Sequence, residues 1–276
     1  MNRYLKLVNF EFSRFLKLYL VLIGITIIVQ LVGVVVESQR YINKANKLIF
    51  EELMKKSDFI ESYGTISFFN FSQTGWFLGP IAIGAVILGI YVFFIWYRDW
   101  FGKNTFSYRL LVLPTARINV YFAKATTILL LVLGLIALQL VLIPIENQVL
   151  KWMVPSEFRT DLSVNQITGI FFLAIIFPKS FIEFILYYGA GMATVFTVFT
   201  AILFERSYRL KGIFFGIVYL ALSFVVFLSP LLVDEFILNQ YFYPLELLIL
   251  QIGTGLLVVA GAIWIGNVLI NKKIRV

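Results

Sequence analysis

The 276-residue sequence contains no cysteine and no histidine. This absence excludes disulfide bonds, thiol or imidazole nucleophiles, and zinc sites built from Cys and His. Charged residues are also scarce, at 14% of the chain, whereas soluble domains carry about a quarter. The sequence has no Gly-x-x-x-x-Gly-Lys-Ser/Thr phosphate loop. We therefore expect no enzyme active site, no metal site and no cofactor in this chain.

Hydrophobic residues are abundant, at 61% of the chain, and aromatic residues reach 17%. This composition predicts an integral membrane protein. The net charge of +8 would suggest a nucleic-acid partner in a soluble protein. Here the basic residues flank long apolar runs, so membrane orientation explains them and we expect membrane lipid, not nucleic acid, around the chain.

Six apolar runs are long enough to cross a bilayer as helices of about 20 residues. They cover residues 18–36, 76–97, 125–145, 180–204, 212–233 and 247–270. The fold class is therefore an all-α integral membrane protein with six transmembrane helices. We see no linker or internal repeat, so a single transmembrane domain over residues 1–276 is expected.

The apolar region 167–204 is too long for one ordinary crossing and is interrupted by Pro178. Two full crossings could meet at this proline, or a short outer half-helix at 167–177 could precede one crossing. The net basic segment that follows, 205–211, should be cytoplasmic, which requires an odd number of crossings. We therefore favour the half-helix followed by one crossing.

The first 17 residues interleave apolar and basic side chains, unlike a signal peptide. On a helix, Tyr4, Val8 and Phe15 share one face, opposite Lys6 and Arg14. This pattern predicts an interfacial elbow helix before the first span. The alternative is a frayed beginning of that span.

Positive charge gathers in alternate connections between the predicted spans. Placing these connections inside puts both termini in the cytoplasm, because positively charged short loops resist translocation. The 37–73 segment then lies outside, as a small helical connector. A reversed orientation would put nearly all of the positive charge outside. We expect a multi-pass membrane protein with both termini in the cytoplasm.

The connection between the second and third predicted spans carries an ordered set of residues. Five are basic and one is acidic (Arg98, Lys103, Arg109, Arg117 and Lys124, with Asp99). Pro114 cannot continue a helix and disfavours helical geometry at the residue before it. The sequence thus predicts a short separate helix around residues 103–112.

In its order of Asp99, Thr105, Leu110, Leu111, Pro114, Arg117 and Lys124, this connection resembles the first cytoplasmic loop of ABC-2 type transporter permeases. One difference is Asn104, where a glycine before the threonine is usual; the glycine here is Gly102. The six-span layout agrees with that of the family, and the resemblance implies a bacterial cell membrane. The resemblance implies a coupling helix that docks on a separate ATPase subunit, which would bind ATP and Mg.

The resemblance also implies which residues contact the ATPase. They are Asp99, Gly102, Lys103, Thr105, Phe106, Arg109, Leu110, Leu111, Pro114, Arg117 and Lys124. It implies a second permease subunit, identical or related, and alternating access for export of an amphipathic or hydrophobic substrate. A peptide antibiotic, toxin, lipid-linked polymer or drug-like molecule would each fit. The alternative function is a non-enzymatic scaffold or sensor subunit of a larger complex.

Some polar residues and glycines lie within the apolar regions. Lys179 and Glu183, spaced for one helical face, are candidates for an outer gate or substrate path, or else lie at the outer interface. The amides are expected to form interhelical hydrogen bonds and the glycines to mark close helix contacts. These residues are Gln30, Gln139, Gln251 and Asn267, and Gly84, Gly89, Gly189 and Gly191.

Overall fold

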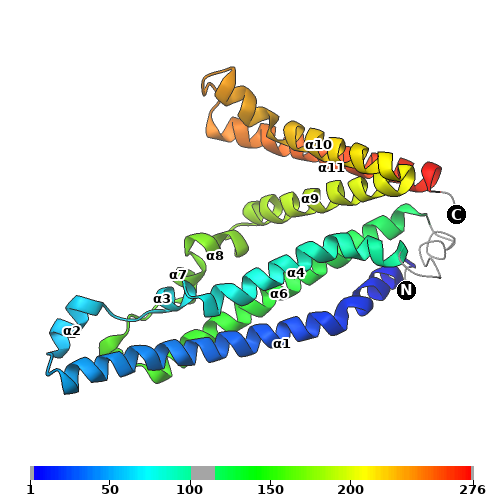
Figure 1. The fold of residues 1–276 in the computed structure, drawn as a ribbon. Coiled ribbons are helices and arrows are strands. Elements are labelled where there is room, and N and C mark those ends of the chain that lie inside the picture. The colour runs from blue at the N-terminus through cyan, green and yellow to red at the C-terminus, as the bar shows by residue number, and fades with distance from the viewer. Residues whose placement is uncertain (1–2, 101–115, 275–276) are drawn as a thin grey trace. The chain divides into compact units, whose positions relative to one another are not determined.

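The computed structural model of the chain describes residues 3–100 and 116–274 (Figure 1). Within them, six long apolar helices have the length and composition to cross a membrane, which confirms the number of predicted spans. These helices are α1 (Arg3–Asn46), α4 (Gly75–Trp100), α6 (Ile118–Met153), α9 (Phe181–Tyr208), α10 (Leu210–Phe236) and α11 (Pro244–Val268). The multi-pass membrane character of the chain follows from this pattern.

Helix α1 differs from the prediction because no break separates an elbow helix from the first span. It runs without interruption from Arg3 to Asn46 and continues as a π-helical turn, Lys47–Glu51. Neither proline nor glycine occurs between residues 3 and 23, so nothing in the local sequence ends the helix there. The first 17 residues are therefore the beginning of α1.

The chain forms two compact units. Unit 1 comprises Met1–Arg14, Leu88–Leu130 and Ser180–Val276, and unit 2 comprises Phe15–Ile87 and Leu131–Lys179. Helices α1, α4 and α6 contribute residues to both units.

The core of unit 2 is built on phenylalanine side chains near the short helix α3 (Phe68–Ser72). Phe68, Phe71 and Phe77 form a triangle with ring centroids 5.6 to 5.8 Å apart and edge-to-face geometry. Edge-to-face contacts suit the ring quadrupoles and add to the gain from burial. Val34 from α1 and Ile143 from α6 belong to the same buried cluster.

The segments that join the helices of unit 2 also contact one another. The segment after α1 contains α2 (Lys56–Tyr63) and α3, as the predicted helical connector requires. Ile66 forms a parallel bridge with Arg159, next to the short helix Ser156–Phe158. Lys56 Nζ lies 2.8 Å from Glu157 Oε2, and this hydrogen bond holds the pKa of Glu157 below its usual value.

The region before α9 contains two short helices, α7 (Val164–Thr168) and α8 (Phe171–Ile176). Pro178 follows α8, and α9 then begins at Phe181. Within residues 164–208, only α9 is long and apolar enough to span a membrane, as the prediction of a half-helix and one span requires. The outer half-helix predicted at 167–177 is divided between α7 and α8, because Gly169 and Ile170 separate them.

In unit 1, α9 and α10 form a hairpin with Arg209 as the connecting residue. A Cβ at Gly212 would lie 2.1 Å from the carbonyl oxygen of Phe204, and one at Gly216 would lie 2.9 Å from that of Ala201. Only glycine fits such an approach, as in small-xxx-small pairs of membrane helices. Both glycines thus mark a close contact between α9 and α10.

The glycines expected to mark close contacts differ from those that do. A Cβ at Gly84 would meet Leu135 at 3.2 Å, but one at Gly89, Gly189 or Gly191 would meet no described atom within 4 Å. The prediction was therefore wrong for these three glycines. The spacing of glycines along one helix does not show which face of that helix packs against a neighbouring helix.

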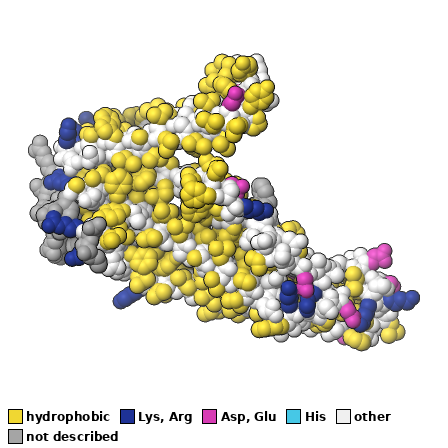
Figure 2. All heavy atoms as spheres, turned by 180° about the vertical axis from the view of Figure 1, so that it is seen from behind, with side chains coloured by type: hydrophobic (Ala, Val, Ile, Leu, Met, Phe, Trp, Pro, Cys, Tyr) yellow, Lys and Arg dark blue, Asp and Glu magenta, His cyan; other side chains and the backbone are white. Residues whose placement is uncertain are grey.

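The surface is largely apolar. Figure 2 shows hydrophobic side chains over most of the visible face, with charged side chains gathered toward its ends. In α10 and α11, large side chains such as Phe214, Leu222, Leu256 and Trp264 are exposed. Lipid tails would cover such faces in a membrane.

Candidate functional site

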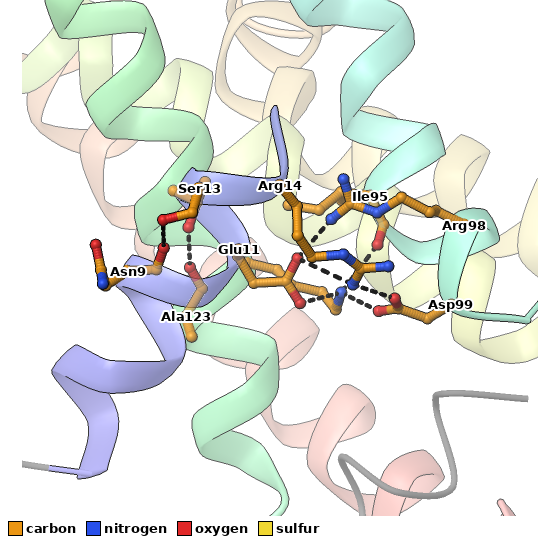
Figure 3. Close-up of polar contacts among 10 residues, drawn as sticks. Asn9, Glu11, Ser13, Arg14, Ile95, Arg98, Asp99 and Ala123 are labelled. Atoms are coloured by element: carbon orange, nitrogen blue, oxygen red, sulfur yellow. Dashed lines mark hydrogen bonds and ion pairs between the residues drawn. The ribbon is translucent and has the colours of Figure 1, made fainter. Parts of the chain in front are cut away.

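Five charged side chains from three helices meet in unit 1, in what we call the charge network. It consists of Glu11 and Arg14 of α1, Arg98 and Asp99 of α4, and Lys124 of α6. Figure 3 shows the labelled members pointing toward one another from separate helices. Glu11 and Arg14 are one helical turn apart, and Arg98 and Asp99 lie in the last turn of α4.

Glu11 links α1 to both other helices. Its Oε1 atom accepts a hydrogen bond of 2.8 Å from Lys124 Nζ, and its Oε2 atom accepts one of 2.8 Å from Arg98 Nη2. Arg14 Nη1 lies 3.9 Å from Oε2. One carboxylate thereby holds a side chain from α4 and one from α6.

Asp99 provides the second carboxylate. Arg14 Nη1 donates to its Oδ1 atom at 2.6 Å, and Lys124 Nζ donates to its Oδ2 atom at 2.5 Å. Lys124 Nζ also donates to the Ile95 carbonyl oxygen at 2.9 Å. The ammonium group thus uses three donors, the number that it has.

The centre of the charge network is closed to solvent. Glu11 and Asp99 are 2% exposed and Lys124 is 1% exposed, whereas Arg14 and Arg98 are 25% and 16% exposed. Three cations face two carboxylates, which leaves a surplus positive charge on the more exposed arginines. A buried ion pair stabilises a fold little more than apolar residues of similar volume would. Removal of one partner, however, leaves a buried charge without a counter-charge and is strongly destabilising. The charge network therefore favours one arrangement of the three helix ends.

An aromatic layer adjoins the charge network. The Lys124 ammonium lies 5.2 Å from the Trp96 ring centroid, a cation–π distance. Trp96 packs edge-on against Phe199 of α9, with centroids 5.6 Å apart. Tyr121 of α6 stacks on Phe196 and donates to its carbonyl oxygen at 2.8 Å. These contacts connect α4 and α6 to α9.

Polar contacts extend this connection to the end of α9. Tyr97 donates a hydrogen bond to Glu205, and the Arg206 guanidinium lies 4.8 Å from the Trp100 ring centroid. Thr200 donates to the Ala262 carbonyl oxygen of α11 at 2.9 Å. The last turn of α4 is thus fixed to α9, and α9 to α11.

Arg117, the residue directly before α6, contacts the C-terminal end of the chain. Its Nη1 atom donates to the carbonyl oxygens of Ile270 at 3.3 Å and Ile274 at 3.4 Å. Ile270 lies in the π-helical turn Leu269–Lys273 that follows α11. The residue expected to contact an ATPase is half-buried and holds the last helical turn.

Most of the residues predicted to contact an ATPase lie outside the described residues. These are Gly102, Lys103, Thr105, Phe106, Arg109, Leu110, Leu111 and Pro114, together with the predicted short helix at 103–112. Asp99 and Lys124 are described, and the structure brings them together in the charge network. Both side chains are buried there and join the ends of α4 and α6, and a contact with an ATPase subunit stays a prediction.

Lys179 and Glu183 do not lie on successive turns of one helix. Lys179 precedes α9, and its amino group lies beside Gly169 of unit 2. Glu183 is in the first turn of α9, where its backbone N–H donates to Ser180 Oγ at 3.2 Å. The assumption of helical spacing was wrong because α9 begins only at Phe181. A gate role for these residues stays a prediction.

Three of the four intramembrane amides form the interhelical hydrogen bonds that were expected. Gln30 and Gln139 donate to one another at 3.4 and 3.1 Å, and Gln30 also donates to the Phe77 carbonyl oxygen. Gln251 donates to the Phe227 carbonyl oxygen at 2.6 Å. Asn267 instead accepts from Asn271, one turn further along.

The sequence reasoning missed Glu11 and assigned Arg14 to a solvent-facing side. The available signal was that Glu11 is the one acidic residue among the first 36. A lone carboxylate in a basic segment that precedes an apolar span suggests a cationic partner. Its partners come from α4 and α6, more than 80 residues away, so only the fold identifies them.

Comparisons of this chain with protein-family models, with curated proteins and with solved structures find no match. The class shown by the fold is thus that of a multi-pass helical membrane protein.

Proposed function

We propose that this chain is the membrane subunit of an ATP-driven exporter of the ABC-2 type. The sequence of the connection between α4 and α6 supports this, together with six helices of membrane-spanning length. The observation that carries the proposal is the charge network, because Asp99 and Lys124 lie on either side of the proposed coupling segment. If an ATPase subunit moves the connection, the helices on both sides of it must be held together for that movement to reach the rest of the chain.

In this proposal, an ATPase subunit binds ATP and Mg and docks on residues 102–114 at the cytoplasmic side. Phe106, Leu110 and Leu111 fill an apolar groove of the ATPase, and Arg109 makes a polar contact. Two permease subunits, identical or related, form the path. Closure of the ATPases on ATP moves the connection, and alternating access carries an amphipathic or hydrophobic substrate out of the cytoplasm or inner leaflet.

The contacts of unit 1 provide a route for that movement. The last turn of α4 is bound to α9 through Tyr97 and Glu205, and Arg117, directly before α6, is bound to the C-terminal turn. Displacement of the connection would act on both sets of contacts. Packed side chains and hydrogen-bond networks of this kind carry energetic coupling between sites.

The test is purification of the affinity-tagged chain from its native membrane, with mass spectrometry of the copurifying proteins and an ATPase assay. We expect an ATPase subunit and ATP hydrolysis to copurify. Both should be lost in Leu110→Asp with Leu111→Asp, because two buried carboxylates cannot occupy an apolar groove.

The matched control is Glu157→Gln, which alters an exposed side chain in the other unit. It should keep both the copurifying subunit and the ATPase activity. If the wild-type chain purifies without an ATPase, the proposal fails. The scaffold or sensor function then takes its place.

A further inference from the structure

Glu146 is a buried carboxyl group for which the proposed function has no role. The predicted third span ended at residue 145, but α6 continues to Met153 and places Glu146 inside the helix. Its side chain is 0% exposed. Neither Oε1 nor Oε2 has a hydrogen-bond partner among the described residues.

The surroundings of Glu146 in unit 2 are apolar. Ile143 and Leu150, one turn away on either side, belong with Val34 of α1 to the buried core cluster. Helical spacing places these two residues on the same face of α6 as Glu146. The carboxyl group therefore lies on the face of α6 that packs on the core.

The charged groups on the neighbouring elements are engaged elsewhere. On α1, Arg40 pairs with Glu37 at 3.6 Å and Lys44 lies over the Tyr63 ring. Lys151 of α6 is 3.9 Å from Asp161, which also pairs with Arg159, and Lys179 lies beside Gly169. Among the described residues, none of these charged groups forms an ion pair with Glu146.

Ser38 of α1 is a second buried polar group without a partner. It is 0% exposed, and its Oγ atom has no hydrogen bond among the described residues. The bond between Gln30 and Gln139 sets the register of α1 and α6. Ser38 follows Gln30 by eight residues and Glu146 follows Gln139 by seven, about 12 and 10.5 Å along the two helices. The two unpartnered groups thus lie at nearly the same level.

A buried carboxylate without a counter-charge costs several kcal/mol, so the neutral acid is the form that such a site retains. We propose that Glu146 is a proton-binding site, with the Ser38 hydroxyl as its neighbouring donor on α1. At neutral pH the site holds one proton as the carboxylic acid. When water enters between α1 and α6, the acid releases its proton to water, and the carboxylate that remains accepts a hydrogen bond from Ser38.

The proposal is tested with a hydrophobic carbodiimide, which reacts with protonated carboxyl groups in apolar surroundings. The full-length chain is treated in its membrane at neutral pH, and its peptides are analysed by mass spectrometry. We expect modification at Glu146 and none at that position in Glu146→Gln. A water-soluble carbodiimide with an added amine should modify the exposed Glu157 and leave Glu146 unmodified.

Two further measurements sharpen the test. The infrared C=O band of a carboxylic acid should be present in the wild-type chain at neutral pH. This measurement does not depend on whether a variant folds. In Ser38→Ala, labelling of Glu146 should persist to higher pH, because a donor to the carboxylate has been removed. An unlabelled Glu146, or a spectrum without the acid band, overturns the proton site. If the labelling of Glu146 depends on pH in the same way in Ser38→Ala as in the wild type, Ser38 is not part of the proton site.

Discussion

Lys124 Nζ lies 2.5 Å from Asp99 Oδ2, and the two residues lie on opposite sides of the connection between α4 and α6. Asp99 lies next to the last residue of α4, and Lys124 is in the second turn of α6. This buried pair therefore joins the last turn of α4 to the second turn of α6. A force applied to that connection acts first on the charge network, which is why we place the network at the centre of the proposed coupling.

Lys124→Met should destabilise the chain by about 3–5 kcal/mol, because Glu11 and Asp99 would remain buried without their shared cation. The measurement is the free energy of unfolding in mixed detergent micelles. Lys56→Met is the control, since Lys56 is an exposed partner in an ion pair of unit 2 and should scarcely change stability. Equal stability of Lys124→Met and wild type would contradict the role assigned to the charge network.

Gln30→Leu and Gln139→Leu should each cost about 0.6–2 kcal/mol, the range for hydrogen bonds between membrane helices. The double variant should cost less than the two single changes together, because each single change already removes the hydrogen bonds between the two amides. A double-mutant cycle of unfolding free energies measures the coupling. Strict additivity would show that the two amides do not act as a pair.

Gly212→Ala should destabilise the α9–α10 hairpin by about 1–3 kcal/mol, the usual cost of overpacking. Its Cβ would lie 2.1 Å from the Phe204 carbonyl oxygen, and backbone cannot move aside cheaply. Gly189→Ala is the matched control, because no described atom lies within 4 Å of its Cβ. Thermal unfolding of the two variants should differ, and similar losses would refute the close approach.

The absence of cysteine allows single cysteines to report on orientation. A membrane-impermeant maleimide should label Glu157→Cys in intact cells and Lys272→Cys only after permeabilisation. The physical reason is that basic segments stay on the cytoplasmic side. The opposite pattern would reverse the predicted topology and remove residues 102–114 from the reach of a cytoplasmic ATPase.

Acid should loosen the contact between Lys56 and Glu157. The hydrogen bond from Lys56 lowers the pKa of Glu157 in the folded chain. The stabilisation is therefore complete above the unfolded pKa and is lost as pH falls through the folded one. Amide exchange at Ile66 and Thr160, corrected for intrinsic rates, should quicken over that interval. In Lys56→Met the corrected rates should not change with pH there.

The sequence by itself determined the class of protein. In lipid, a backbone polar group without a hydrogen bond is costly, so spanning segments are helices, and the bilayer thickness fixes their length and apolar character. It located the six long apolar helices and the presence of one such helix after Pro178. It also identified three amides as interhelical donors. Boundaries were less certain: α1 and α6 run well past the predicted spans, since helices do not end where apolar character does.

The tertiary structure decided which residues meet. Glu11 finds its partners on α4 and α6, Gly212 lies on the face of α10 that α9 covers, and Glu146 is turned into the core. Each fact depends on the rotation and register of one helix against another. Those are set by side-chain packing between segments far apart in the chain, and periodicity along a single helix does not contain them.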